Sequence, residues 1–383
     1  MNYRTVLWGT LGATAVLTLA GAGWVIMLPS SQTPKPPPQI AQEEVDAALA
    51  SLRPPKRQRP LIAIIGINDA TETTDYLTPY GILRRADVAD VLTLATAPGP
   101  VTLYPALKVE PNATIAEFDA QHPQGADYVI VPAMSRDDDP AVMAWLKAQA
   151  AKGATVVGIC AGVKVVAAAG LLDGKRATTH WYFLKELRKK HPSIQYAEDR
   201  RLVVDGARAT TTGISASMPM MLTLVEAIAD RDKAEAVAKD LGIAEWDARH
   251  DSSAFKLTRP FASTVLRNLF AFWNWEKLGI ALSPGMDEVS LALAADAWSR
   301  TYRSRVVTFA DKSEAHESRN GARILPDEVA GSWPPGYLVA AEVEQRPAEA
   351  LEQTLDVMAT RYGPQTAAIV AMQLEYPRKQ PEH

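Results

Sequence analysis

Cysteine is nearly absent from this chain: Cys160 is the only one among 383 residues. A single cysteine excludes an internal disulfide and any zinc site built from several cysteines, and it leaves the redox state of the compartment open. A basic excess is missing as well, because the formal net charge is −4. A general nucleic-acid-binding surface needs such an excess, so no nucleic-acid partner is expected.

Charge is missing altogether from residues 6–28, and Trp8 and Trp24 lie towards the two ends of that stretch. About 20 apolar residues span a bilayer, so the sequence predicts a transmembrane helix within residues 1–28. A cleaved signal peptide with small residues at 20–22 is the alternative. Arg4 precedes the segment. The positive-inside rule therefore predicts a membrane-anchored protein whose globular part is periplasmic or extracellular.

Proline is concentrated just after this stretch, in residues 29–38. That composition is typical of an extended spacer, and we expect a Pro-rich linker over residues 29–59. Farther on, continuous apolar runs such as 61–65 and 128–131 alternate with helical patterns. Such runs are typical of parallel strands covered on both faces. The alternation predicts an α/β domain with a mostly parallel sheet over residues 60–245.

Cys160 occupies a distinctive place in this pattern. A β-branched run ends at Gly158, the cysteine follows two residues later, and a helical pattern begins after Gly162. This order predicts a nucleophile elbow, a sharp turn between a strand and a helix. The positive end of the helix would lower the pKa of a thiol there. The alternative interpretation is a small buried apolar side chain.

Three motifs carry a resemblance to a known family: 158–162 (GICAG), 167–174 (AAAGLLDG) and 177–181 (ATTHW). Together they resemble the DJ-1/PfpI superfamily, which is class I glutamine amidotransferase-like. The similar branch contains isonitrile hydratase and the sensor domains of AraC-type regulators, here without their helix-turn-helix. The resemblance runs from about residue 60 to residue 241. It implies a flavodoxin-like three-layer sandwich and a reactive cysteine at Cys160.

The resemblance also implies two partners for this cysteine. Asp75 matches the family's acidic residue beside the thiol, where a carboxyl can hold or supply a proton. A helix N-cap is the alternative role for Asp75. His180 matches the histidine of the Thr-Thr-His segment, as a helper of the thiolate or as a structural residue.

Backbone amides at Ala161, Ala133 and Met134 match the positions that build an oxyanion site in the family. All three positions depart from the family pattern. Ala161 stands where protease-like members have histidine, so a peptidase is not expected. Ala133 and Met134 replace a Gly-Gly turn, which changes the backbone freedom of the site.

Residues 246–383 read as a smaller, degenerate α/β half-repeat. A strand pattern at 278–282, a helix at 288–300 and a strand at 305–310 repeat the order of the first domain, and 321–327 parallels 105–111. There is no second cysteine, so this half is expected to be catalytically silent. It would pack on the first domain as an intrachain pseudo-dimer, and dimerisation with a second chain is the alternative.

Three functions remain open from the sequence. The first is a cysteine-dependent hydrolase or hydro-lyase, similar to isonitrile hydratase, that acts on a small electrophilic substrate through Cys160, Asp75 and His180. The second is a non-catalytic ligand or redox sensor derived from a regulator's sensor domain. The third is a regulator-derived protein that has lost its DNA-binding half and acts through partners. None of these interpretations calls for a cofactor or a metal ion, and the expected partner is a small molecule.

Overall fold

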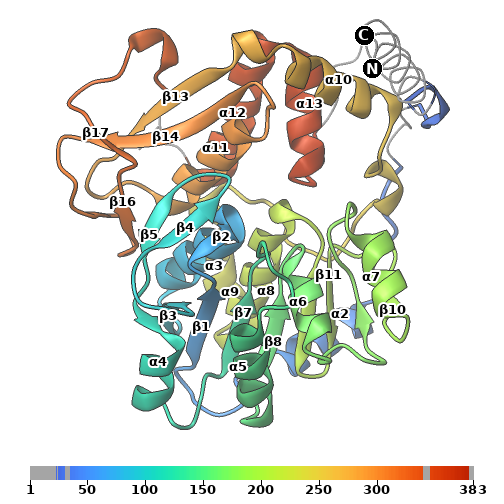
Figure 1. Ribbon diagram of the computed structural model, residues 1–383. Coiled ribbons are helices and arrows are strands. Elements are labelled where there is room, and N and C mark those ends of the chain that lie inside the picture. The colour runs from blue at the N-terminus through green and yellow to red at the C-terminus, as the bar shows by residue number, and fades with distance from the viewer. Residues whose placement is uncertain (1–22, 24, 31–34, 340–345, 379–383) are drawn as a thin grey trace, which may run out of the picture.

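The computed structural model describes residues 23, 25–30, 35–339 and 346–378 (Figure 1). Its central element is a seven-stranded sheet in which all neighbouring strands are parallel except the pair at one edge, β11 and β12. Across the sheet, the strands are β11 (Leu202–Asp205), β12 (Arg208–Thr211), β8 (Thr155–Gly158), β7 (Tyr128–Val131), β1 (Leu61–Gly66), β3 (Asp90–Ala95) and β6 (Ala113–Thr114). The fold is therefore mixed α/β with a mostly parallel sheet.

Helices cover both faces of this sheet. Alternate residues of β1 point to opposite sides, so Ile62 and Ile64 join one buried cluster while Ala63 and Ile65 join the other. The first cluster lies under α2 (Gln42–Ser51), α3 (Thr73–Ala86), α8 (Ser217–Ile228) and α9 (Arg231–Leu241). The second lies under α4 (Ile115–Gln121), α5 (Pro140–Ala151) and α6 (Gly162–Ala168).

The second half of the chain has a sheet of its own. Strands β13 (Glu276–Ala281), β14 (Ser304–Ala310) and β17 (Glu328–Val329) are parallel. The helices of this half are α10 (Arg259–Phe270), α11 (Glu288–Ser299), α12 (Pro347–Tyr362) and α13 (Pro364–Gln373). A five-stranded sheet joins the halves, in the order β15 (His316–Glu317), β16 (Arg323–Leu325), β5 (Lys108–Glu110), β4 (Val101–Tyr104) and β2 (Asp69–Glu72).

One local arrangement occurs in both halves. In the first, the N–H and hydroxyl of Thr93 donate to Asn112 Oδ1 at 2.8 and 2.9 Å, and the Asn112 N–H returns a bond to the Thr93 carbonyl. In the second, the N–H and hydroxyl of Thr308 donate to Asp327 Oδ2 at 2.8 and 2.9 Å, with the same return bond. Both threonines lie on the strand that follows the helix, β3 or β14.

The predicted N-terminal transmembrane helix needs a correction. Residues 6–22 and 24 lie outside the described residues, and in the part of the chain that is described no helix is long and apolar enough to cross a membrane. The described end of the segment lies against α10. The Arg259 guanidinium donates to the Ile26 carbonyl at 2.8 Å, and the Arg259 backbone N–H donates to the Pro29 carbonyl. The predicted fold class with a membrane helix is therefore wrong, and so is the membrane-anchored, periplasmic or extracellular location derived from it.

The stretch predicted as a linker makes contacts with the first domain. Leu52, at the end of α2, is fully buried, and its carbonyl accepts the Tyr128 hydroxyl at 2.6 Å. Lys56 donates to the carbonyl of Ala126, and Arg57 pairs with buried Asp127 at 2.5 Å. Residues 52–57 therefore pack at the amino-terminal edge of the sheet, whereas α2 lies against α8 and β11.

The remaining elements lie beyond the elbow. Strands β9 (Arg176–Ala177) and β10 (Gln195–Tyr196) form a small parallel pair, and α7 (Leu184–Lys190) lies between them in sequence. These short elements connect α6 to the edge strand β11 (Figure 1).

Candidate active site

The turn around Cys160 has the geometry of a nucleophile elbow. Cys160 has φ of 55°, in the left-handed region that side chains other than glycine seldom adopt. A Cβ at Gly162 would lie 2.0 Å from the Val131 carbonyl oxygen, and one at Gly158 would lie 3.1 Å from the Cα of Val163. The flanking glycines are therefore required because β8, β7 and α6 approach one another closely at this turn.

Threonines hold the elbow backbone. The N–H of Cys160 donates to Thr211 Oγ1 at 3.2 Å, and the Thr179 hydroxyl donates to the Cys160 carbonyl at 2.9 Å. The N–H of Thr178 in turn donates to Thr210 Oγ1 at 3.0 Å. The Thr-Thr part of the motif at 177–181 thus fixes the strained turn in place.

Asp75 lies beneath the elbow, fully buried in the first turn of α3. Its Oδ2 accepts the Ala133 N–H at 3.0 Å, whereas its Oδ1 is buried without a hydrogen-bond partner among the described residues. The helix cap is Glu72, whose carboxylate accepts the Asp75 N–H at 2.6 Å. The capping role considered for Asp75 therefore belongs to Glu72, whose carboxyl lies close enough to affect the pKa of Asp75.

The electrostatics of the thiol differ from the sequence expectation. Burial raises the pKa of Cys160 well above its usual value, and the charges of Asp75 and Glu72 raise it further. The Ala161 N–H and Arg300 act in the opposite direction without prevailing. With a side chain only 5% exposed, Cys160 is a protonated thiol at rest, and the helix end does not make it a thiolate.

Burial also raises the pKa of Asp75 to about 7, against the opposing effects of the Ala133 N–H and Arg300. The pKa of Glu72 rises to about 7 through burial and the charge of Asp75. Two neighbouring carboxyls that titrate together near neutral pH can take up and release a proton there.

The second half supplies two residues that the sequence analysis missed. Arg300 follows α11, is 15% exposed, and pairs with Glu72 at 2.8 Å and with fully buried Asp296 at 2.6 Å. Burial alone would lower the pKa of Arg300, but Asp296 and Glu72 outweigh it and raise the value. Arg300 is the positive charge closest to the elbow among the groups that affect Cys160.

The charge balance of this cluster limits the ionisation of its carboxyl groups. One guanidinium faces three buried carboxyls, Glu72, Asp75 and Asp296, and burial raises the pKa of Asp296 well above its usual value. Uncompensated buried carboxylates are costly, so the group retains protons at neutral pH. Glu72 could have been found from its spacing before Asp75, since an acid three residues earlier is a capping signal.

The contact between the halves is reciprocal. Arg300, at the end of α11, pairs with Glu72, the N-cap of α3. Arg85, in the last turn of α3, pairs with Asp287, the N-cap of α11. In a two-fold interface every contact occurs twice, with the roles of the two units exchanged. The two arginine–carboxylate pairs follow this pattern.

His180 is held at both ring nitrogens by backbone groups. Its Nδ1 accepts the Tyr182 N–H at 3.2 Å, which assigns the proton to Nε2, and Nε2 bonds to the Gln373 carbonyl at 3.0 Å. Burial lowers the pKa of His180, which favours this neutral ring. Both nitrogens are thus engaged, and the ring links the motif to the end of α13.

The predicted oxyanion amides are also partly committed. The Ala133 N–H is engaged with Asp75, and the Ala161 N–H faces the sulfur of Cys160. Met134 forms an isolated bridge with Thr71 of β2. No group of three His, Cys, Asp or Glu residues suited to a metal ion occurs within the described part of the chain.

These features define an α/β protein with a cysteine at a nucleophile elbow. Residues 62–227 match the DJ-1/PfpI family. The isonitrile hydratase of Pseudomonas putida is 32% identical over 171 residues, which are 44% of this chain and 72% of that protein. The chain belongs to the DJ-1/PfpI family, which confirms the resemblance drawn from the motifs.

Two further similarities are shorter or more distant. The HTH-type transcriptional regulator CdhR of Pseudomonas aeruginosa is 38% identical over 86 residues, 22% of this chain and 25% of that protein. The chain thus spans about a quarter of that regulator's length. The crystal structure of Drosophila melanogaster DJ-1beta is 22% identical, covers 49% of this chain and 100% of that one, and gives a TM-score of 0.44.

Proposed function

We propose that this chain is an enzyme in which Cys160 adds to a small electrophilic substrate and Asp75 carries the proton. A hydrolase or hydro-lyase reaction on a carbon–nitrogen or carbonyl group fits this pair of residues. The observation that carries the proposal is Oδ1 of Asp75, which is buried without a partner among the described residues and lies within electrostatic range of the thiol.

The first step follows from the two pKa directions. Since burial keeps Cys160 as a thiol, thiolate is scarce, and the sulfur needs a base at the moment of attack. Asp75, with a pKa of about 7, is partly ionised at neutral pH and matches that task. As the sulfur bonds to the electrophilic carbon, the S–H proton moves to Oδ1, and the displaced π-electron pair moves onto the substrate.

The later steps return each group to its starting state. Asp75 gives its proton to the substrate atom that received the electron pair. Water then adds to the same carbon, the carbon–sulfur bond breaks, and the departing sulfur regains a proton from that water through Asp75. The net change is one water added to the substrate, and the Ala161 N–H beside the sulfur eases the build-up of negative charge on it.

A ligand sensor is the second candidate, favoured by the similarity to a transcriptional regulator. In that case the same site binds a small molecule without turning it over. A redox sensor fits less well, because sensor cysteines have a low pKa and are accessible. Cys160 is 5% exposed, and burial raises its pKa.

The proposed domain organisation assigns the site to both halves. Residues 60–245 form the DJ-1/PfpI domain, and 246–383 form a silent half-repeat that acts as a built-in partner. The repeated Thr–Asn and Thr–Asp arrangements and the reciprocal arginine pairs support this. A Cβ at Gly81 of α3 would lie 2.5 Å from Glu288 of α11, so this face of α3 has no room for another chain. Light scattering should therefore find a monomer.

The experiment incubates the protein with a panel of isonitriles, nitriles and aldehydes and measures product formation. Cys160→Ala should abolish turnover, and Asp75→Asn should lower it by roughly 10²–10⁴-fold, the usual contribution of a positioned acid–base group. Ser290→Ala is the matched control, since Ser290 is the third residue of α11 as Asp75 is of α3. Saturable binding by wild type without any product would instead establish the sensor.

A further inference from the structure

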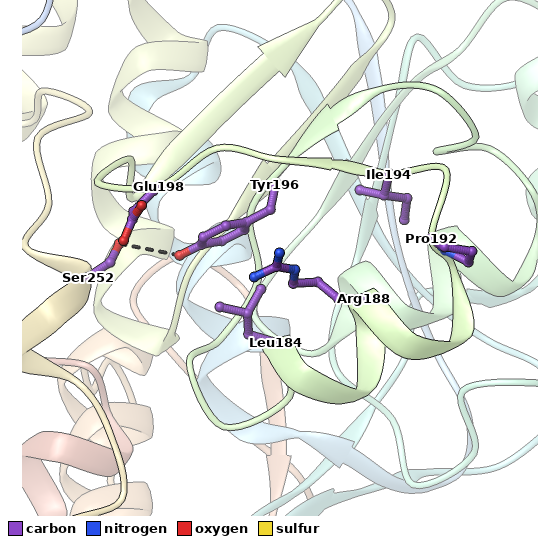
Figure 2. Close-up of a pocket in the computed structure, with 7 residues that line it drawn as sticks. All are labelled: Leu184, Arg188, Pro192, Ile194, Tyr196, Glu198 and Ser252. Atoms are coloured by element: carbon purple, nitrogen blue, oxygen red, sulfur yellow. Dashed lines mark hydrogen bonds between the residues drawn. The ribbon is translucent and has the colours of Figure 1, made fainter. Parts of the chain in front are cut away.

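A separate hollow of ≈ 560 Å³ lies beyond the elbow, between α7, β10 and the 3₁₀ turn Ser252–Ala254 (Figure 2). Its volume is within the range of small-molecule sites. None of the residues of the Cys160 cluster lines it. The lining residues are Leu184, Arg188, Pro192, Ile194, Tyr196, Glu198 and Ser252.

The wall of this hollow is held by hydrogen bonds. The Ser252 hydroxyl accepts the Asp199 N–H at 2.9 Å and the Tyr196 hydroxyl at 3.4 Å, as the dashed line in Figure 2 marks for the latter. The Ser252 N–H donates to Asp199 Oδ1 at 2.9 Å. Ser252 comes from the segment after the first domain, so these bonds close one end of the hollow across a long sequence separation.

Two opposite charges line the hollow without neutralising each other. Arg188 has its guanidinium carbon 6.0 Å from the centre of the Tyr196 ring and forms no ion pair within the described part of the chain. Glu198 likewise has no ion pair or hydrogen bond there. On the same helix Lys190 pairs with Glu186 at 2.7 Å, whereas Lys185 and Lys189, like Arg188, form no ion pair within the described residues.

The remaining lining supplies apolar surface. In Figure 2 the Arg188 guanidinium lies between Leu184 and the Tyr196 ring, with Ile194 and Pro192 on one side and Glu198 on the other. A ligand with a single charge would meet one attractive and one repulsive group in this hollow. A ligand with both charges satisfies both groups and covers the apolar surface.

We propose that this hollow binds a small zwitterion of the size of an amino acid or a dipeptide. Its carboxylate bonds to the Arg188 guanidinium, which presents paired N–H donors to such a group. Its ammonium group pairs with the Glu198 carboxylate, and its apolar side chain lies against Leu184 and Ile194. This site is independent of the reaction proposed at Cys160.

The test is titration calorimetry of the full chain with leucyl-leucine, its N-acetyl form and its C-terminal amide. Wild type should bind the free dipeptide at least ~5-fold more tightly than either blocked form, the scale of one partly exposed charge pair. Arg188→Gln should weaken the free dipeptide but leave the amide unchanged. Glu198→Gln should weaken the free dipeptide but leave the N-acetyl form unchanged.

Two further variants separate this site from other effects. Lys185→Gln, on the same helix but outside the hollow, should bind like wild type. Cys160→Ala should also bind like wild type, because Cys160 does not line the hollow. The binding result therefore does not depend on whether the proposed reaction at Cys160 is detected. No saturable binding of the free dipeptide up to about 10 mM, or equal losses for all three ligands in Arg188→Gln, would overturn the proposal.

Discussion

Replacing Asp75 by asparagine tests the cost of burying a carboxyl at this site. Burial raises the pKa of Asp75 from 3.8 to about 7. A difference of about 3 pH units, at about 1.4 kcal/mol each, gives about 4 kcal/mol. The folded state thus holds a proton that the unfolded state releases. The contribution of Asp75 to wild-type stability therefore falls as pH rises from about 4 to about 7, and it changes little at higher pH.

Asp75→Asn has no such titration. Its carbonyl can still accept the Ala133 N–H, while its amide group adds a pH-independent cost of about 1–3 kcal/mol where it lacks a partner. Urea unfolding at several pH values should therefore show the stability of the variant relative to wild type improving by up to about 4 kcal/mol from about pH 4 to about pH 8.

Asp127→Asn is the control for this measurement, because Asp127 is also fully buried but pairs with Arg57 at 2.5 Å and accepts the Leu61 N–H at 2.8 Å. Its loss should destabilise the protein at neutral pH, since Arg57 loses its partner. A difference between Asp75→Asn and wild type that stays constant with pH would refute the reasoning about Asp75.

The remaining predictions concern the groups around the elbow. Arg300→Met should cost about 3–5 kcal/mol at neutral pH, less in acid where the carboxyls are protonated, and should change the alkylation rate of Cys160. Arg85→Met, its counterpart, should destabilise comparably in urea unfolding but leave that rate unchanged. Gly162→Ala should cost about 3 kcal/mol or more, because its Cβ would lie 2.0 Å from a carbonyl oxygen. Thr179→Val should cost about 1 kcal/mol through the lost bond to the elbow, measured in the same way; an unchanged stability in either variant would contradict the account of the turn.

The elbow was predictable because its causes are local. Glycines two residues before and after Cys160 are visible in the sequence, and the close strand–helix approach that needs them follows from their spacing. The position of Asp75 could be predicted because parallel strands bring their carboxyl ends to one edge. Its free Oδ1 could not, because that depends on Ala133 taking Oδ2 and on Glu72 taking over the helix cap.

Arg300 and Asp296 were missed because their role depends on packing between distant segments. Arg300 contacts Glu72 across 228 positions of sequence, and no local pattern reports that contact. The predicted half-repeat suggested which segments of the two halves correspond, but not that α11 would bring a charge close to the elbow. The membrane-helix prediction used the absence of charge in residues 6–28, the length of the run and the tryptophans near its ends. It had no information on the contact of Ile26 and Pro29 with Arg259.

The most direct test of the account is the pH dependence of Cys160 modification by a small neutral electrophile under single-turnover conditions. In wild type the rate should rise to a plateau with a midpoint near 7, as Asp75 ionises and becomes able to accept the thiol proton. In Asp75→Asn that midpoint should disappear, and the rate should rise only at high pH as the thiol itself ionises. The same midpoint near 7 in both proteins would contradict the assignment of Asp75 as the base for Cys160.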